Sequence, residues 1–336
     1  MKMIIKAGLY VSAALLACAL MGCGSKTTSK TDNTADNSTI ILGEFNADSA
    51  YSFIADQVNF GPRVPGTPEH KACVEYLTDK FKQYADSVIL QEGEVTAYNG
   101  TVLPITNIIA GFNTNATKRI VLAAHYDTRP WADNERNSET RHLPILGAND
   151  GGSGTAVLLE IARNLHKNHP AVGVDLILFD AEDYGNNDGF SDNSETWCLG
   201  SRYWADNNMI PYNKFNLPVY GILLDMVGGR DARFHYELFS QSEALTPTIK
   251  VWAEAEKLGF NNVFIREIGG AVTDDHVIMT RAGIPTTDII ESVNVETSSF
   301  PPTWHTHADN MAYIDKNTLE AVGKTVLNVI YKEKTF

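Results

Sequence analysis

The sequence predicts an α/β protein, a three-layer sandwich in which helices cover both faces of a mostly parallel central sheet. The apolar runs VLAA, VDLILFDA and VYGILLDMV are typical of strands buried on both faces, because they lack a regular polar alternation. Segments with helical signals separate these runs, and strands that alternate with helices indicate a parallel sheet with both faces covered. The 336 residues suffice for one large domain of this class.

The elements follow in an order that caps, glycines and apolar runs indicate. Thr67 and Pro68 supply a cap and a first residue for a long helix, and the glycines after Asp150 allow close backbone approach at the start of another. Helices are expected over 48–58, 67–84, 150–166, from 199 onward, and over 243–257, 273–281 and 316–333. Strands are expected over 87–91, 106–111, 120–124, 174–179, 219–224, 262–265 and 285–289. Long polar loops are expected over 128–147 and 184–196.

The first segment has the pattern of a bacterial lipoprotein signal. Lys2 and Lys6 flank the start of an apolar run that continues to residue 21, and Gly22 stands directly before Cys23. A membrane-spanning helix is the alternative, but about 15 apolar residues are short for the ~20 that a span needs. We therefore expect cleavage before Cys23 and attachment of lipid to it.

Three segments follow from this interpretation. Residues 1–22 are the signal peptide, residues 23–47 are a flexible tether rich in Ser, Thr, Asn and Asp, and residues 48–336 are a single catalytic α/β domain. Gly24 follows the lipid acceptor, where an Asp would retain a lipoprotein at the inner membrane in many Gram-negative bacteria. We therefore expect a lipid anchor at the outer membrane, with the domain facing the periplasm.

Charge excludes some classes of partner. The formal net charge is −14, and loss of Lys2 and Lys6 with the signal lowers it to −16. A chain this acidic is expected to bind nucleic acid and anionic membrane surfaces poorly. We therefore expect membrane contact only through lipid on Cys23. Of the remaining cysteines, Cys73 is expected to be a buried thiol within a helix. Pairing of Cys73 with Cys198 stays open, since the periplasm permits disulfides.

Five short acidic or histidine motifs point to a functional site. Each stands near the end of an apolar run, and open α/β sheets place ligand sites beyond the carboxyl ends of their strands. Oxygen and imidazole ligands gathered there indicate a metal site. The motifs are His125-Tyr126-Asp127, Asn149-Asp150, Glu182-Asp183, Asp225 and Trp304-His305-Thr306.

The residue types favour zinc. Asp150, Asp183 and His305 offer the carboxylate and imidazole ligands of a catalytic zinc site, which keeps one position open. Glu182, next to Asp183, stays free to act as a general base beside the metal. The alternative, that these are ordinary helix caps and solvated loop acids, suits any one of them alone better than all of them together. His125 and Asp127 either ligate a second metal or form a hydrogen-bonded structural pair.

Two other kinds of site are weaker alternatives. A serine hydrolase needs the pattern G-x-S-x-G, but Thr155 stands where the last glycine belongs. The loop 184–196 has Asn186, Asp188, Gly189 and Glu195 at the offsets of a calcium loop. Tyr184 occupies the position of the first calcium ligand, so a solvated loop is favoured over Ca²⁺ binding.

From about Asn59 to about Asp315 the chain resembles the zinc aminopeptidase superfamily, and within it the glutaminyl-peptide cyclotransferases (glutaminyl cyclases). FGPRVPG and WHT followed by DN are the specific motifs, whereas HYD, Asn-Asp-Gly and Glu-Asp are common to the superfamily. The resemblance is carried by FGPRVPGTPEH, HYDTRPW, GANDGGSG, LILFDAED, GSRYWA, LLDMVGG, TDDH and FPPTWHTHADN.

The resemblance implies a role for each matching residue. Asp150, Asp183 and His305 match the ligands of a single zinc ion, and Glu182 matches the acid that transfers the proton. Asp225 and Asp274 match two carboxylates of a hydrogen-bond network beside the substrate. Trp197 and Trp304 match two tryptophans of the substrate pocket. Animal cyclases carry two glutamates where this chain has Glu182-Asp183, so the chain looks like the bacterial branch.

The implied activity is conversion of the N-terminal glutamine of peptides and proteins to pyroglutamate, with release of ammonia and one Zn²⁺ per chain. The alternative is a two-zinc aminopeptidase that uses His125, Asp150, Asp183, Asp225 and His305. Asp274 and Trp304 favour the cyclase, because the peptidases usually have Ser and Tyr there. A binding lipoprotein without catalysis would have no evident use for the free Glu182.

Overall fold

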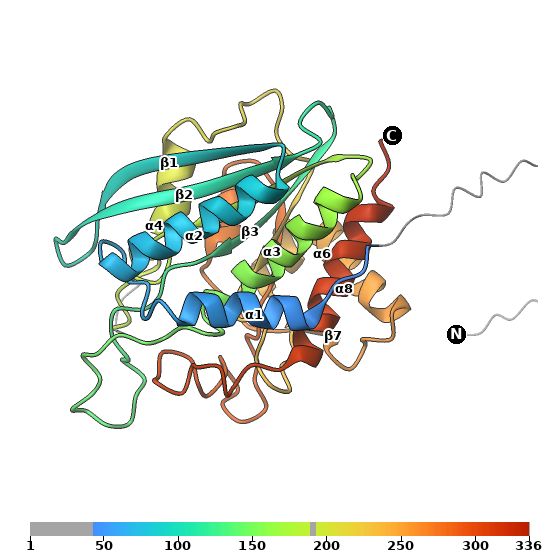
Figure 1. The fold of residues 1–336 in the computed structure, drawn as a ribbon. Helices are drawn as coiled ribbons and strands as arrows, with labels where there is room; N and C mark the ends of the chain where they lie inside the picture. The colour runs from blue at the N-terminus through green and yellow to red at the C-terminus, as the bar shows by residue number, and fades with distance from the viewer. Residues whose placement is uncertain (1–42, 189–192, 336) are drawn as a thin grey trace, which may run out of the picture. The chain divides into compact units, whose positions relative to one another are not determined.

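A six-stranded sheet in the order β1-β2-β4-β3-β5-β8 forms the centre of the fold (Figure 1). The structure is a computed structural model and describes residues 43–188 and 193–335. β3, β4, β5 and β8 run parallel to one another, whereas β2 pairs antiparallel with both β1 and β4. The bounds are β1 Ser87–Thr96, β2 Val102–Phe112, β3 Arg119–His125, β4 Gly173–Phe179, β5 Gly221–Leu224 and β8 Thr286–Ile289.

Helices cover both faces of this sheet, which confirms the predicted three layers. Leu122 and Ala124 of β3 join the large apolar core beneath α1, α2, α3, α6 and α8. Val121 and Ala123, which point the other way, join a second core with α4 and α7. The bounds are α1 Ala47–Val58, α2 Pro68–Tyr84, α3 Gly152–Lys167, α4 Leu199–Asp206, α6 Leu245–Lys257, α7 Asp275–Arg281 and α8 Lys316–Lys332.

Local signals predicted most of these elements to within a few residues, and the exceptions are short or exposed. The helix α5 (Leu238–Glu243) and the strand β6 (Phe234–Tyr236), which pairs with β7 (Phe264–Ile268), were not expected. α5 has no apolar period of its own and begins because the Glu237 carboxylate accepts hydrogen bonds from Phe239 N and Ser240 N. β1 and β2 extend beyond their apolar residues as a long hairpin.

The signal peptide, most of the tether and Cys23 lie outside the described residues, so those expectations stay predictions. Among the residues that the structure describes, no helix is long and apolar enough to cross a membrane.

The parallel strands bring part of the site to one edge of the sheet. β3 ends at His125, β4 ends shortly before Glu182 and Asp183, and β5 ends directly before Asp225. Two of the five motifs do not close a strand, contrary to expectation. Asp150 lies two residues before α3, and His305 lies in the long loop between β8 and α8, so folding of these loops completes the site.

Candidate metal centre and catalytic site

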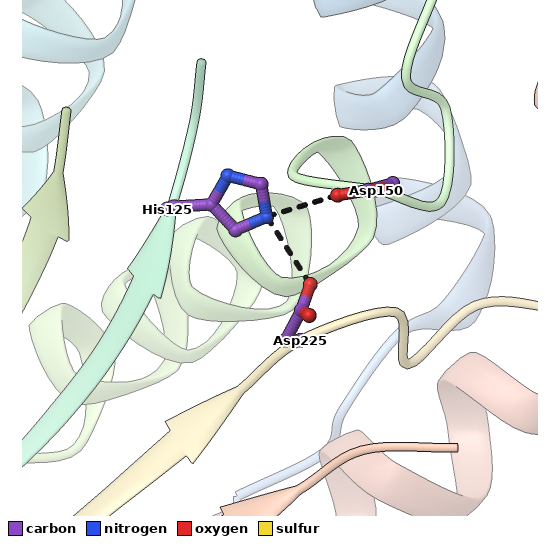
Figure 2. Close-up of side chains that lie close together, drawn as sticks. All are labelled: His125, Asp150 and Asp225. Atoms are coloured by element: carbon purple, nitrogen blue, oxygen red, sulfur yellow. Dashed lines mark hydrogen bonds and ion pairs between the residues drawn. The ribbon is translucent and has the colours of Figure 1, made fainter. Parts of the chain in front are cut away.

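Among the described residues, four groups of three buried side chains could hold a metal ion, and two of these groups meet at Asp150 beyond the carboxyl ends of the strands. Asp150, Asp183 and His305 form the first group, and in each group the ligand atoms all lie within 4.8 Å of one another. His305 Nε2 lies 3.0 Å from Asp183 Oδ1 and 3.8 Å from Asp150 Oδ2. His125, Asp150 and Asp225 form the second group, so the two groups share Asp150 (Figure 2).

The first group has the donor set of a metal site. Oδ2 of both Asp150 and Asp183 is buried and has no hydrogen-bond partner among the described residues. A buried carboxylate oxygen without a partner is costly, and a divalent cation would remove that cost. Burial, followed by the charge of Asp150, raises the pKa of Asp183 to about 6, which is the effect expected of carboxylates that lack a cation. Asp150, Asp183 and His305 therefore fit a bound metal ion.

In the second group a histidine takes the place between the carboxylates. His125 Nε2 lies 3.2 Å from Oδ1 of Asp150 and 3.2 Å from Oδ1 of Asp225. Burial disfavours its charged form, but hydrogen bonds to Asp127, Asp150 and Asp225 outweigh burial and raise the pKa of His125 well above its usual range. The imidazole thus fills the place between the two carboxylates, and its hydrogen bonds favour its protonated form.

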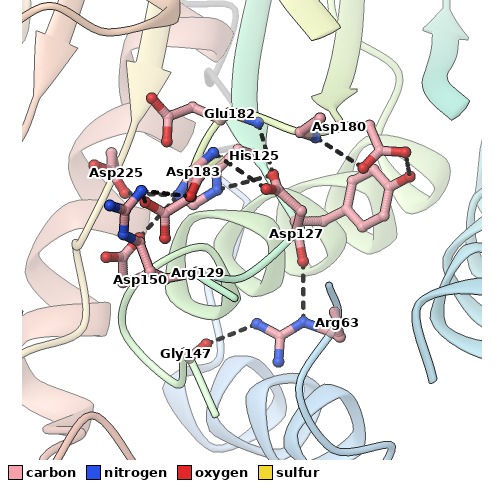
Figure 3. A network of polar contacts seen from close by, with 12 residues as sticks. Arg63, His125, Asp127, Arg129, Gly147, Asp150, Asp180, Glu182, Asp183 and Asp225 are labelled. Atoms are coloured by element: carbon pink, nitrogen blue, oxygen red, sulfur yellow. Dashed lines mark hydrogen bonds and ion pairs between the residues drawn. The ribbon is translucent and has the colours of Figure 1, made fainter. Parts of the chain in front are cut away.

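Asp127 supports the ends of two strands (Figure 3). Its Oδ1 lies 3.3 Å from His125 Nδ1 and accepts a hydrogen bond from Glu182 N, 3.0 Å away. Its Oδ2 accepts from Asp183 N at 3.2 Å. Both oxygens are used inside the protein, which favours the structural interpretation of the His125–Asp127 pair over a second metal held by Asp127.

Glu182, Asp225 and Asp274 line one cavity of about 350 Å³ together with the first ligand group. Burial raises the pKa of Glu182 well above its usual range, and the Asp274 and Asp183 charges add to this. Burial and the Asp225 charge raise the pKa of Asp274 to about 7. A buried carboxyl whose pKa is raised toward neutrality is suited to move protons.

Trp197 and Trp304 also line this cavity, and the rings of both stack on that of His305. Trp304 stacks on the His305 ring with centroids 3.9 Å apart, and Trp197 stacks near it at 6.0 Å. Phe300 packs against Trp304 at 4.4 Å. The two indoles thus form apolar walls beside the carboxylates of the site, as the sequence led us to expect.

Arg129 and Asp133 were missed by the sequence analysis, although both lie in the HYDTRPW region or directly after it. Asp133 Oδ1 lies 3.0 Å from His305 Nδ1, the ring nitrogen that faces away from Asp183. Arg129 binds Asp133 at 2.6 Å and donates to the backbone oxygens of Asp183 and Gly185. Metal sites commonly have a carboxylate behind a ligating histidine. An acidic residue so close to the HYDTRPW motif could therefore have suggested that Asp133 orients His305.

Two further buried groups hold the loop that carries Asp150. Asp309 accepts hydrogen bonds from the backbone N of Asn149 and Asp150, at 2.8 Å and 3.0 Å. Arg63 of the FGPRVPG motif donates to the backbone oxygens of Leu146 and Gly147, both at 2.7 Å, and Figure 3 shows the contact with Gly147. The specific motif therefore serves the site through the backbone and not by contact with the cavity.

Several residues around the cavity have left-handed backbone, which is unfavourable for side chains other than glycine. The φ angles are 49° at Ala181, 61° at Cys198, 49° at Met226 and 55° at His305. Such strain persists where surrounding contacts impose it, and it gathers at functional sites.

The remaining candidates lie elsewhere or have other partners. Cys73 and Cys198 are both buried and free, so they do not pair. Ser153 is fully buried, and its hydroxyl donates to Asn149 O at 2.6 Å, away from the cavity. Glu195, the last residue of the calcium-like pattern, forms an ion pair with Arg202 at 2.5 Å; Gly189 of that pattern lies outside the described residues.

Comparison with known proteins gives consistent matches. The model of Peptidase family M28 matches residues 107–330. Bovine glutaminyl-peptide cyclotransferase is 25% identical over 301 residues, which cover 81% of this chain and 78% of the bovine protein. The glutaminyl cyclase of Bacteroides thetaiotaomicron is similar in structure, with a TM-score of 0.83, 49% identity and coverage of 87% of this chain and 100% of that one. A Zn-dependent exopeptidase of Parabacteroides distasonis matches with a TM-score of 0.83, 45% identity, and coverage of 87% and 100%.

Proposed function

The chain belongs to peptidase family M28, and from this premise we propose that it is a glutaminyl-peptide cyclotransferase, a transferase that converts N-terminal glutamine to pyroglutamate and releases ammonia. The observation that carries this function is the position of Glu182. It lies beside Asp183, outside both ligand groups that share Asp150, and lines the same cavity as Asp225 and Asp274. Two tryptophans wall this cavity, which suits a small uncharged side chain such as that of glutamine.

Asp150, Asp183 and His305 would hold one zinc ion per chain. When bound, zinc supplies a Lewis acid that polarises the side-chain amide carbonyl and stabilises the developing negative charge on its oxygen. The choice of one ion is supported by the His125 ring, whose Nε2 lies 3.2 Å from Oδ1 of both Asp150 and Asp225 and so fills the place between these carboxylates. Calcium has no comparable support, since Tyr184 replaces its first ligand and Glu195 is bound by Arg202.

Glu182 moves the proton in this reaction. The α-amine of the substrate attacks the side-chain amide carbon, so a C–N bond forms and the five-membered ring closes. Glu182 takes the proton that the amine loses and passes it to the amide nitrogen, which then leaves as ammonia. Asp225 and Asp274 hold that nitrogen, and Trp197 and Trp304 pack the glutamine stem and exclude water.

Incubation with two peptides tests the activity directly. A Gln-initiated peptide should lose the mass of one ammonia, while a Leu-initiated peptide should stay intact. Shortening of the Leu peptide without change in the Gln peptide would instead identify an aminopeptidase. Metal analysis of the same preparation should give close to one zinc per chain, and a value close to two would support the peptidase that also uses His125 and Asp225.

Replacement of the base separates its role from metal binding. Glu182→Ala should abolish turnover, because no other group takes the proton, while the zinc content stays at the wild-type value. Cyclisation by this variant at close to the wild-type rate would remove Glu182 from the mechanism.

The location is proposed from the sequence pattern alone. The protein is anchored at the outer membrane by lipid on Cys23 and faces the periplasm, where it acts on N-terminal Gln peptides and proteins. A coil of ~24 residues spans roughly 25–30 Å, enough to keep the acidic domain clear of anionic headgroups. Cys23→Ala should release a soluble and active enzyme. Sedimentation of that variant with membranes would indicate an uncleaved signal helix.

A further inference from the structure

Cys198 lies beside the cavity and has no part in the mechanism above. Its side chain is fully buried, and its Sγ lies 3.3 Å from Glu182 Oε1, the distance of a hydrogen bond donated by the thiol. Within the described ranges, no other side chain donates a hydrogen bond to the Glu182 carboxylate. We propose that Cys198 is a positioning residue whose thiol holds the Glu182 carboxylate in the orientation for proton transfer. This inference rests on the proposed function.

The backbone holds the two residues against each other. Cys198 N donates to Glu182 O at 3.0 Å, and Leu199 N donates to Ala181 O at 3.1 Å. Ala181 and Cys198 both have left-handed backbone, which is unfavourable for an L-amino acid with a side chain. Two strained residues that face each other across a pair of hydrogen bonds indicate a contact that the surrounding fold imposes.

The residues on either side leave this contact little freedom. A Cβ at Gly200 would lie 2.0 Å from Asp180 O, so only glycine permits the chain to approach this closely. The Asp180 carboxylate accepts hydrogen bonds from Ala181 N at 2.8 Å and from Thr106 N at 2.7 Å. These bonds fix the segment of Asp180 and Ala181, against which Gly200 packs. The thiol is therefore held at a fixed place next to the carboxylate.

A thiol has properties that suit this position. It is small enough for a fully buried site and is a weak donor, so it orients a carboxylate without strongly reducing its basicity. Burial raises the pKa of Cys198 well above its usual range, which keeps the proton on sulfur. Alanine would fill nearly the same space but would leave the carboxylate without its donor, whereas serine would keep a donor there.

Cys73 provides the matched control. Of the residues that the structure describes, it is the other buried free cysteine, and no side chain or backbone group among them is hydrogen-bonded to its Sγ. It lies in α2 among the apolar side chains of the large core. At such a site alanine should be tolerated better than serine, because the hydroxyl would be buried without a partner. Its variants should change stability and leave turnover unchanged.

The test compares turnover of a Gln-initiated peptide by Cys198→Ala, Cys198→Gly and Cys198→Ser, together with Cys73→Ala and Cys73→Ser. Glycine is included because it suits the positive φ and removes the donor. The two donor-free variants should lose roughly tenfold in kcat with KM within about twofold, since a misplaced base slows chemistry but not binding. Cys198→Ser should recover most of the loss, and zinc content should stay unchanged throughout.

Two outcomes would overturn the proposal: full kcat in Cys198→Ala and Cys198→Gly, or an equal loss in Cys198→Ser. A change confined to KM or to thermal stability would do the same, because it would assign Cys198 to packing. If the wild type leaves the Gln peptide unchanged but shortens the Leu peptide, the proposed function fails, and the same kcat comparison on the Leu peptide still tests the role of Cys198.

Discussion

The two ligand groups share Asp150 but satisfy their charges in different ways. In the group of Asp150, Asp183 and His305, one buried oxygen of each carboxylate has no hydrogen-bond partner among the described residues. In the group of His125, Asp150 and Asp225, the imidazole lies 3.2 Å from both carboxylates and binds them itself. The first group therefore fits a bound metal ion, whereas in the second group the His125 ring fills the place between the carboxylates.

The same fold can thus present one metal site or two, depending on the state of a single histidine. A neutral His125 would be a third ligand for a second metal, and a protonated His125 takes the place of that metal. Three hydrogen-bonding carboxylates around it stabilise the protonated form in this chain. The comparison therefore favours one ion per chain, and each of the following predictions tests it.

The largest effect on zinc affinity is expected when a carboxylate of the first group is replaced. The matched replacement in the second group should leave zinc binding intact. Asp183→Asn should lower zinc affinity by more than about 100-fold, since loss of even an outer-shell partner costs 10–100-fold. Asp225→Asn, the matched change in the second group, should keep one zinc per chain and lose activity through the substrate network. Zinc affinity is measured by competition with a chromophoric chelator. Equal loss of zinc from both variants would contradict the assignment of the two groups.

A smaller effect is expected from the carboxylates behind the two histidines. Asp133→Asn should weaken zinc binding by about 10–100-fold, because Asp133 lies behind His305 Nδ1 at 3.0 Å and orients the ligand. Asp127→Asn is the control, since Asp127 lies behind His125 and accepts from the backbone of Glu182 and Asp183. It should lower thermal stability and change zinc affinity less than Asp133→Asn does. The reverse ranking would mean that His125 holds the metal.

The smallest effect is the pH dependence of stability in the metal-free protein. Burial disfavours the charged form of His305, but Asp183 and Asp133 outweigh it and raise its pKa from 6.5 to about 9. The folded protein then holds a proton that the unfolded chain loses, so this stabilisation is complete below pH 6.5 and disappears as the pH rises through about 9. Thermal denaturation with a chelator present should show this decline.

Two controls accompany the pH measurement. His305→Asn should reduce the decline, and saturating zinc should remove it, because the metal displaces the proton from the imidazole. A melting temperature that is flat over this pH range in the metal-free wild type would contradict the pairing of His305 with the two carboxylates.

Local residue patterns were sufficient for the architecture and for most of the site. Thr67 and Pro68 mark the start of α2, where Thr67 accepts a hydrogen bond from His70 N. The apolar runs before His125, Glu182 and Asp225 predict parallel strands, and parallel strands bring their carboxyl ends to one edge. Those signals are local, because caps and strand patterns depend on neighbouring residues.

Tertiary packing decided what no local pattern contains. Asp133 lies behind His305 and Asp309 holds the backbone of Asp150, although these partners are far apart in the chain. Cys198 contacts Glu182, which lies 16 residues earlier. Packing also brings His125 between two carboxylates, which favours its protonated form. Contacts of this kind depend on the paths of long loops and on desolvation in the folded state, and residue spacing carries no information about either.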